Sequence, residues 1–565
     1  MRKNRKPLVL GSCFAITLIL IVAGIFLVKK LIPSKEVMDL NEYYPVEKDS
    51  ILVVLQDEVY EKQGLYLDGV PFIDYETVVD KFNKRFYWDE HENLLIYTTS
   101  SEVIKTEVGS EDYYENKSKA SLTHQIVKTI GEQVYIALDY VRMFSNIEYE
   151  VFEEPARVVI NYKWGEEFLY TQVKKKTQLR TEATIKSPIL KQLGVGDVLT
   201  YVENDSLVKE GFSKVITKDG IMGYVKNKYV KAAYYETPVS DYHEVEYSHI
   251  SKDYKVNLVW HQVTNQEANN NLLNAISSTK GVTTISPTWF SISSNEGEIV
   301  SIASEMYVER AHNEDIEVWA LCDDFNKEVD MKELLSYTSR REKLINELIS
   351  YAIKYNLDGL NIDFERITEN SAIDYIQFLR ELSIKCRNNG IILSVDTYVP
   401  APYTQFYDRE EQGKIVDYVI IMGYDEHHAS SEECGSVSSI SFVESAIENT
   451  LAEVPKERII MGIPFYTRLW TEGEDGMITS EACGMEQGLA YLEVNGVEPV
   501  WQSETGQYYG EYEAEDGQKR IWLEEDKSIE LKMKAIQNSD VAGVAAWKLG
   551  LEKDSVWNVI IKYVN

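Results

Sequence analysis

The C-terminal part of the chain contains a series of eight short apolar runs separated by helical patterns, and this series constrains the fold more than any other feature. Continuous apolar strands that alternate with amphipathic helices indicate a parallel sheet covered by helices on both faces. Eight such units in about 310 residues fit a (β/α)8 barrel. The runs that we expect to form its strands are 255–263, 282–292, 316–324, 357–365, 391–399, 416–426, 459–466 and 541–550.

We therefore predict an α/β fold in which residues 250–565 form a (β/α)8 TIM barrel. A doubly wound open sheet is the alternative, but no GxGxxG motif follows the first apolar run. The interval between the seventh and eighth runs is long and rich in Tyr, Trp, Glu and Gly. We expect residues 467–540 to form a small α+β insertion there.

Polar and aromatic side chains follow most of these runs, at the point where each strand is expected to end. In a (β/α)8 barrel the carboxyl ends of the strands surround the active site, so we expect these side chains to meet at one face. Aromatic rings beside carboxylic acids are typical of a carbohydrate site, because rings stack on sugars and acids move protons. The residues include Trp260, Trp289, Asp323, Asp324, Asp363, Glu365, Asp396, Tyr398, Tyr424, Asp425, Tyr466 and Trp547.

The fourth run carries the most informative pattern. Asn361, Asp363 and Glu365 are spaced two residues apart, so their side chains point to one face of a strand. Two neighbouring acids raise the pKa of one of them, which lets that carboxyl stay protonated and act as a general acid. A loop-end acid cluster that binds Ca²⁺ or solvent is the alternative interpretation.

Three motifs resemble glycoside hydrolase family 18, the chitinase-like hydrolases. Asp358-Gly-Leu-Asn-Ile-Asp-Phe-Glu365 resembles the DGxxxDxE strand of that family, and Met422-Gly-Tyr424-Asp425 resembles its strand-six motif. Trp547 falls where the family places the tryptophan under the −1 sugar. The stretch 522–528, followed by AAWKLGLE, is similar to the spore-cortex and cell-wall N-acetylglucosaminidases of the SleL-like type.

The resemblance implies a mechanism in which the substrate supplies its own nucleophile, its 2-acetamido oxygen; this family is an exception to the rule of two catalytic carboxylates. Glu365 would protonate the leaving oxygen and then act as base on water. Asp363 would accept the acetamido N–H, and Tyr424 would donate its hydroxyl to the acetamido oxygen. Asp425 would bind a hydroxyl of the −1 sugar. The implied reaction needs no cofactor and no metal.

Further site residues are expected around these three catalytic groups. Asp358 is out of phase with the inward-facing residues, so we expect a structural or electrostatic role for it. Arg468 either contacts substrate or braces a loop. Asn361 departs from many chitinases, which have Asp there; an amide can hydrogen-bond to Asp363 but cannot take up a proton. The residues expected to bind substrate are Asp425, Trp547, Asn361, Met422, Tyr398, Arg468 and Trp289.

The N-terminus predicts a membrane anchor. Residues 8–28 are 21 residues without a charge, which is long enough to span a hydrocarbon core of ~30 Å. Basic residues flank this run, and their excess on its N-terminal side places residues 1–7 in the cytoplasm and the remainder outside. A cleaved signal peptide is the alternative. Five cysteines in 565 residues fit an exported bacterial envelope protein better than a disulfide-rich secreted domain.

Two further regions separate this run from the barrel. Residues 40–165 contain two copies of a helix-then-hairpin pattern, one from Pro71 and one from Gln133, which resemble the small repeat domain at the N-terminus of copper amine oxidases. A stalk is the favoured role. Residues 168–235 form short runs punctuated by glycines and resemble a bacterial Src-homology-3-like barrel. The second resemblance implies contact with cell-wall peptide, with an inert spacer as the alternative.

The net charge of the chain argues against one class of binding partner. The chain has 58 basic and 92 acidic residues, a net charge of −34, which argues against nucleic acid. We therefore expect a membrane-anchored extracytoplasmic glycosidase that cleaves a β-1,4-linked N-acetylglucosamine polymer, with peptidoglycan favoured. The alternatives are a chitinase or endo-N-acetylglucosaminidase that acts on another glycan, and a carbohydrate-binding envelope protein without hydrolytic activity.

Overall fold

The structure is a computed structural model that describes residues 29–115, 118–202 and 211–564, with a few scattered residues between 14 and 24. Most of the predicted membrane anchor, residues 8–28, lies outside the described residues. Within the described part, no helix is both long enough and apolar enough to cross a bilayer. The chain divides into two compact units. One unit holds 245–565 with the short segments 89–93 and 98–104, and the other holds the rest.

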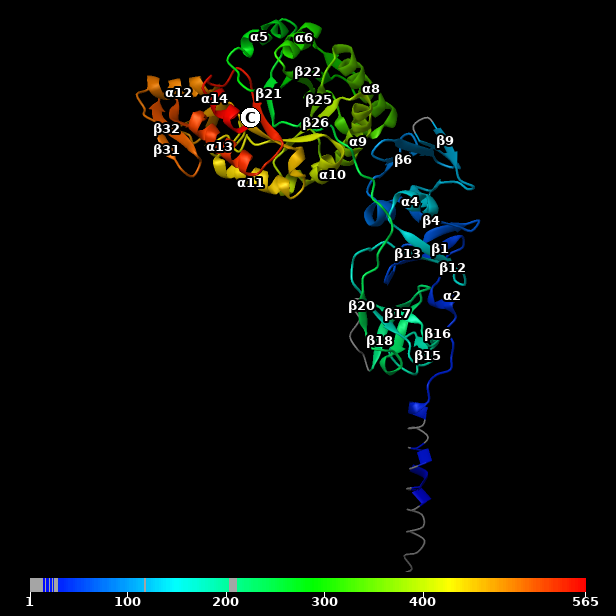
Figure 1. Ribbon diagram of the computed structural model, residues 1–565. Helices are drawn as coiled ribbons and strands as arrows, with labels where there is room; N and C mark the ends of the chain where they lie inside the picture. Colours follow the sequence, from blue (N-terminus) through cyan, green and yellow to red (C-terminus); the bar gives the residue numbers. More distant parts are fainter. Residues whose placement is uncertain are drawn as a thin grey trace, which may run out of the picture. The chain divides into compact units, whose positions relative to one another are not determined.

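The C-terminal unit is a closed barrel of eight parallel strands (Figure 1). The first strand pairs with both the second and the last, which closes the sheet. The predicted eight-stranded barrel is thus confirmed, with one strand in each apolar run. The strands are β21 (Val256–His261), β22 (Thr284–Ile292), β24 (Glu317–Asp323), β25 (Gly359–Asp363), β26 (Ile392–Tyr398), β27 (Tyr418–Met422), β28 (Ile459–Pro464) and β34 (Gly543–Trp547).

Helices surround this barrel (Figure 1). They form because their apolar residues recur every three to four positions, which gives each helix one stripe to bury against the strands. In α8, for example, Leu344, Leu348 and Ala352 are buried, and Asn356 caps the C-terminal end of the helix in the left-handed conformation. The helices are α5 (Leu272–Ala275), α6 (Glu305–Asn313), α7 (Met331–Ser336), α8 (Thr338–Tyr355), α9 (Ala372–Asn389), α10 (Arg409–Ile415), α11 (Ile440–Leu451), α13 (Asp526–Asn538) and α14 (Val556–Val564).

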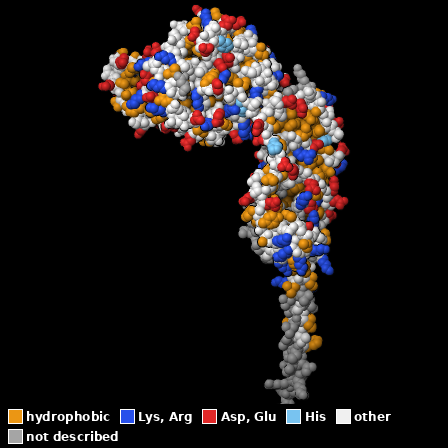
Figure 2. Space-filling view, in the orientation of Figure 1, with side chains coloured by type: hydrophobic (Ala, Val, Ile, Leu, Met, Phe, Trp, Pro, Cys, Tyr) orange, Lys and Arg blue, Asp and Glu red, His pale blue; other side chains and the backbone are white. Residues whose placement is uncertain are grey.

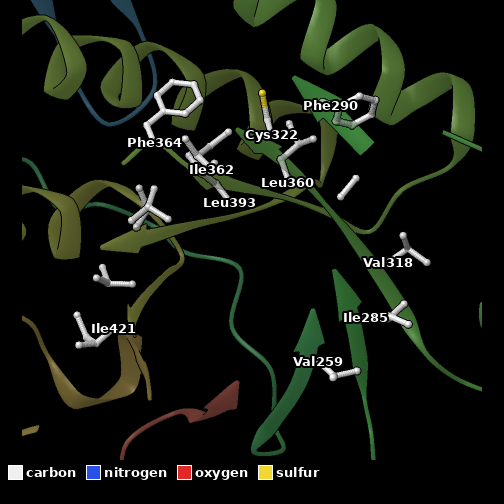
Figure 3. Close-up of a cluster of buried hydrophobic side chains, with 14 of the residues drawn as sticks. Val259, Ile285, Phe290, Val318, Cys322, Leu360, Ile362, Phe364, Leu393 and Ile421 are labelled. Atoms are coloured by element: carbon white, nitrogen blue, oxygen red, sulfur yellow. The ribbon is translucent and has the colours of Figure 1, made fainter. Parts of the chain in front are cut away.

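Strand residues alternate between two cores. Outward side chains such as Leu360, Ile362 and Leu393 belong to the large cluster between strands and helices, part of which Figure 3 shows. Inward side chains such as Trp319 and Ile420 form a smaller cluster inside the barrel. On β25 the apolar residues therefore face the helices, and the intervening Asn361 and Asp363 face the barrel interior.

A small antiparallel sheet is inserted between β28 and β34. Its order is β30-β29-β33-β32-β31. The predicted insertion of 467–540 is longer than this sheet, because α13 packs against α11 and α14 and belongs to the helices around the barrel. The inserted elements are β29 (Tyr466–Glu472), β30 (Ile478–Gly484), α12 (Met485–Val494), β31 (Val500–Gln502), β32 (Gln507–Ala514) and β33 (Gly517–Leu523).

The N-terminal unit contains most of the two pattern copies of region 40–165, except that residues 89–93 and 98 of the first copy group with the other unit. Each has the order strand, short helix, strand, strand. The first copy is β4 (Val70–Asp74), α3 (Tyr75–Thr77) with a π-helical turn over Val78–Phe82, β5 (Phe86–Asp89) and β6 (Leu94–Thr98). The second is β11 (Gln133–Ala137), α4 (Leu138–Phe144), β12 (Glu148–Phe152) and β13 (Arg157–Asn161). The resemblance to the copper amine oxidase repeat stays a prediction.

The same unit ends in a sheet of seven strands with the order β16-β15-β19-β18-β17-β14-β20. Figure 2 shows Lys and Arg side chains gathered over this sheet, whereas the barrel unit carries acidic and basic side chains intermixed. Its resemblance to a Src-homology-3-like barrel also stays a prediction. The strands are β14 (Phe168–Gln172), β15 (Thr177–Arg180), β16 (Ile189–Leu193), β17 (Val198–Tyr201), β18 (Phe212–Thr217), β19 (Met222–Lys226) and β20 (Tyr234–Glu236).

Closure of the barrel depends on a glycine. Gly543 of β34 lies opposite Val256 of β21, and a Cβ at position 543 would lie 2.1 Å from the Val256 carbonyl oxygen. We expect Gly543→Ala to lower the free energy of unfolding by about 1–3 kcal/mol or more, because one strand must shift. Denaturant unfolding measures this. Gly488→Ala is the control: its Cβ meets only side-chain ends, at 3.2 Å or more, and an equal loss there would contradict the explanation.

Candidate active site

A cavity of about 970 Å³ lies at the carboxyl ends of the barrel strands. The three residues predicted to be catalytic, Asp363, Glu365 and Tyr424, all line it. So do five of the seven residues predicted to bind substrate: Asp425, Trp547, Met422, Tyr398 and Arg468. The structure therefore gathers residues from five barrel strands and from the first inserted strand around one space.

Trp289 does not belong to this site. The register between β22 and β24 shifts between Thr288 and Phe290, next to Trp289. The indole is 2% exposed in the outer core, where its Nε1–H donates to Asn269 Oδ1 at 2.8 Å. The prediction that Trp289 binds substrate is therefore wrong.

Asn361 also does not reach the cavity. It is fully buried, and its Oδ1 accepts hydrogen bonds from Trp260 Nε1 at 2.9 Å and Ser286 Oγ at 3.0 Å. Its Nδ2 donates to Ser394 Oγ at 3.1 Å and Asp396 Oδ1 at 2.8 Å. The amide thus bonds to Asp396 and not to Asp363, and it braces the barrel interior below the cavity rather than contacting substrate.

Glu365 follows the end of β25 and is held from two sides. Its Oε2 accepts a hydrogen bond from the Tyr398 hydroxyl at 2.7 Å, and its backbone N–H donates to Asp324 Oδ1 at 3.0 Å. Burial raises the pKa of Glu365; the Tyr398 hydrogen bond lowers it, and the charge of Asp425 raises it. The net rise favours the protonated form that a general acid needs.

Asp363 is a buried carboxyl of the site, with 5% of its surface exposed. Its Oδ1 is buried and has no hydrogen-bond partner among the described residues. Burial raises its pKa well above the usual range, and the charges of Asp396 and Glu365 raise it further. A buried acceptor without a donor costs free energy, so this oxygen is suited to receive an N–H from a ligand.

Aromatic rings form one wall of the cavity. Trp260 contacts both Tyr424 and Trp547 edge-on, with ring centroids 6.4 and 5.9 Å apart. Trp547 is only partly buried, so part of its ring stays accessible to a sugar. The Tyr424 hydroxyl makes no hydrogen bond with any other described residue, and its ring contacts that of Tyr466 edge-on. Asp425 accepts a hydrogen bond from the Tyr466 hydroxyl at 2.5 Å.

Three of the cavity residues at strand ends were expected there but given no part in catalysis or substrate binding: Trp260, Asp396 and Tyr466. Each ends or follows a predicted strand, so the signal was the position of the residue rather than a motif. Asp358, in contrast, lies at the opposite end of β25. It accepts hydrogen bonds from His312 Nε2 and the Val318 N–H, both at 2.8 Å, and so links α6, β24 and β25 away from the cavity.

Metal chemistry has no evident site in the described part of the chain. No group of three or more His, Cys, Asp or Glu side chains there is arranged to hold an ion. The carboxyls of the cavity lie on neighbouring strand ends beside aromatic rings, an arrangement that suits proton transfer on a carbohydrate.

Comparison with known proteins identifies the class. The family described as glycosyl hydrolases family 18 matches residues 257–552, more than half of the chain. The protein is a glycoside hydrolase. More specifically, it belongs to glycosyl hydrolase family 18.

Relatives in Bacillus subtilis are similar over the barrel. The uncharacterized glycosylase YvbX is 26% identical over 281 residues, which cover 47% of this chain and 80% of YvbX. The cortical fragment-lytic enzyme is 27% identical over 240 residues, which cover 41% of this chain and 56% of that enzyme, little more than half of its length. Among solved structures, the spore cortex-lytic enzyme SleL of Bacillus cereus shares the fold, with a TM-score of 0.51 at 20% identity, covering 57% of this chain and 78% of SleL.

Removal of the Tyr398 hydroxyl should change the pH dependence of catalysis. The hydrogen bond from Tyr398 lowers the pKa of Glu365, so Tyr398→Phe should raise that pKa. If Glu365 must be protonated to act, the alkaline limb of kcat/KM moves to higher pH. Tyr403→Phe, which removes an exposed hydroxyl elsewhere on the cavity wall, is the control for the position of this limb. An unmoved limb in Tyr398→Phe would contradict the assignment.

Asp363→Asn should stabilise the fold while impairing the enzyme. The folded-state pKa of Asp363 is raised, so the wild-type carboxyl favours folding only below its unfolded pKa of about 3.9, and this advantage is lost as pH rises. The amide avoids the loss. We expect a melting temperature a few degrees above wild type at pH 8 and no gain near pH 3. A gain of equal size at both pH values would show that ionisation of Asp363 is not the cause.

Proposed function

We propose that the protein hydrolyses β-1,4-linked N-acetylglucosamine-containing polysaccharide by substrate-assisted retaining catalysis. One observation carries the proposal: the unpartnered buried Oδ1 of Asp363 lines the same cavity as the raised-pKa acid Glu365 and the free hydroxyl of Tyr424. A donor, an acceptor and a proton source within one cavity match the three polar demands of a reacting 2-acetamido sugar.

The reaction begins with proton transfer from Glu365 to the glycosidic oxygen, which breaks the bond to the anomeric carbon. The acetamido oxygen of the −1 sugar attacks that carbon and forms an oxazolinium ring. Asp363 accepts the acetamido N–H and offsets the positive charge on the ring, while Tyr424 donates to the acetamido oxygen and aligns it for attack. Glu365 then takes a proton from water as that water opens the ring.

The remaining cavity residues position the sugar. Trp547 provides a partly exposed ring under the −1 sugar, and Asp425 accepts a hydrogen bond from a sugar hydroxyl. Tyr398 contacts the acid itself, so its main role is to hold Glu365 in place and to set its pKa. Arg468 and Met422 complete the wall.

Peptidoglycan is the polymer that we favour. The names of two relatives, a cortical fragment-lytic enzyme and a spore cortex-lytic enzyme, support a wall glycan as substrate. Chitin or another N-acetylglucosamine glycan is the second candidate, since the contacts proposed above involve only the acetamido sugar that these polymers share. A carbohydrate-binding protein without hydrolysis is disfavoured, because a lectin has no need of Glu365 with a raised pKa.

We also propose that the catalytic barrel lies outside the cytoplasmic membrane of a bacterium. The support is the charge-free run 8–28, with residues 1–7 in the cytoplasm by the positive-inside rule. Region 40–165 would act as a stalk, and region 168–235 would contact wall peptide.

The decisive experiment is product analysis with wild type and Glu365→Gln. Wild type should release N-acetylglucosamine-containing fragments from purified peptidoglycan or chitin oligomers, measured by mass spectrometry. Glu365→Gln should lose at least about a hundredfold in kcat, because the amide cannot donate the proton. Glu433→Gln, an exposed substitution in the barrel unit, is the matched control. Unchanged turnover in Glu365→Gln would refute the proposed acid.

The same assay tests assistance by the substrate. Oligomers whose acetamido groups have been removed lack the internal nucleophile and should not be cleaved. Cleavage of these oligomers at a rate near that of the acetylated ones would exclude the oxazolinium route. Binding of the acetylated oligomers without any product would favour the lectin alternative.

A further inference from the structure

Asp363 has a second carboxyl as its neighbour on the adjoining strand. β25 and β26 pair in parallel with Ile362 opposite Val395, so Asp363 and Asp396 follow at facing positions of the two strands. Neighbouring strands lie ~4.8 Å apart, and paired residues of parallel strands point to the same face. Both aspartates line the cavity, and Asp396 is only 2% exposed.

Asn361, at the position where many chitinases have an acid, hydrogen-bonds to the Asp396 carboxyl. An acid is common there in chitinases, and an amide cannot store a proton. The Asn361 Nδ2 donates to Asp396 Oδ1 at 2.8 Å, and its Oδ1 is occupied by Trp260 and Ser286. Its orientation is therefore fixed, and it presents a donor to Asp396 and nothing to Asp363.

The charged and titratable groups around the two aspartates are almost all acids or phenols. Asp323 and Asp324 lie at and just after the end of β24, and Glu365 follows β25. Tyr398 ends β26, and Tyr424 follows β27. Arg468 lines the same cavity from the inserted sheet. Neither Asp363 nor Asp396 forms an ion pair within the described residues, since the cations nearby bond elsewhere. Two close buried carboxyls without a cation cannot both ionise readily and tend to share one proton.

We propose that Asp396 is the proton store of this active site, replacing on strand five the acid that Asn361 does not provide on strand four. The proposal rests on the proposed function. At rest Asp363 holds the proton, because the Asn361 donor stabilises the ionised form of Asp396. When the acetamido N–H reaches Asp363, the O–H bond on Asp363 breaks and one forms on Asp396. Asp363 then carries the negative charge that faces the oxazolinium ring.

The acidities agree with this arrangement. Burial raises the pKa of Asp396 well above its usual range, against the lowering effect of the Asn361 hydrogen bond. For Asp363 the charge of Asp396 is the largest effect after burial. The pair therefore titrates in two steps that belong to both residues, and one proton stays between them over the range separating the steps. Asp396 acts through Asp363 and does not touch the reacting atoms, so it is a positioning residue.

The test moves the carboxyl from strand five to strand four. Asp396→Asn keeps the size and the amide partner but removes the store, and we expect kcat to fall about 10–100-fold with KM changed less than about threefold. The double variant Asn361→Asp/Asp396→Asn returns an acid beside Asp363 and should recover most of the lost kcat. Asp323→Asn, on the other strand beside Asp363, is the charge control, because its carboxyl does not line the cavity.

A second measurement needs no substrate and separates this proposal from the function. Infrared difference spectra of the full chain over a pH series should contain the C=O band of a protonated carboxyl that is lost at lower pH in Asp396→Asn than in wild type. The loss moves to lower pH because Asp363 no longer faces the charge of Asp396, although burial still raises its pKa. The wild-type pH dependence of the band should return in the double variant. Its presence and loss support the shared proton even if the wild type cleaves neither polymer, a result that would count against the proposed function alone.

Three outcomes would overturn the proposal. The first is wild-type kcat in a folded Asp396→Asn variant. The second is a loss of kcat that the double variant does not recover although both variants melt at the wild-type temperature, which would indicate a merely structural role. The third is an unchanged carboxyl band in Asp396→Asn.

Discussion

The site depends on the alternation of side chains along β25, a strand that pairs on both sides within the closed barrel. Leu360 and Ile362 of β25 face the helices and bury their apolar surface there, so Asn361 and Asp363 must face the barrel interior. The strand is paired on both sides and cannot slip, because a shift of one residue would place the acids among the helices and the apolar residues in the cavity. Burial of the outer core thus sets the direction in which the carboxyls point.

Because these carboxyls point into the barrel interior, their ionised forms cost electrostatic free energy. Asp363, Asp396 and Glu365 are drawn together in a space from which most water is excluded, and the pKa of each is raised. The large apolar core between strands and helices offsets this cost, and the resulting acidities suit chemistry at neutral pH. The Tyr398 hydrogen bond limits the rise in the pKa of Glu365, because it stabilises the ionised form of that carboxyl.

The sequence predicted the barrel well, because each strand is a continuous apolar run and periodicity reports burial directly. It also predicted most of the cavity, because strand ends share one face. Trp289 was wrongly predicted to bind substrate because a register shift on β22 changes which residues face outward, and no local pattern reveals it. The contacts of Asn361 were not predicted, because its partners Ser286 and Ser394 lie on other strands and are brought to it only when the barrel forms. The inserted sheet was predicted too long because α13, a helix packed outside the barrel, follows it without a clear break.

The inserted sheet has a consequence of its own. β29 begins at Tyr466 and Arg468 on the cavity wall and continues into a layer with a separate hydrophobic interior. The acids Asp363 and Asp396 lie on β25 and β26, whereas part of the cavity wall comes from the inserted sheet. A change within the inserted sheet would therefore reshape the cavity wall at Tyr466 and Arg468 and leave the buried acids of the barrel strands in place.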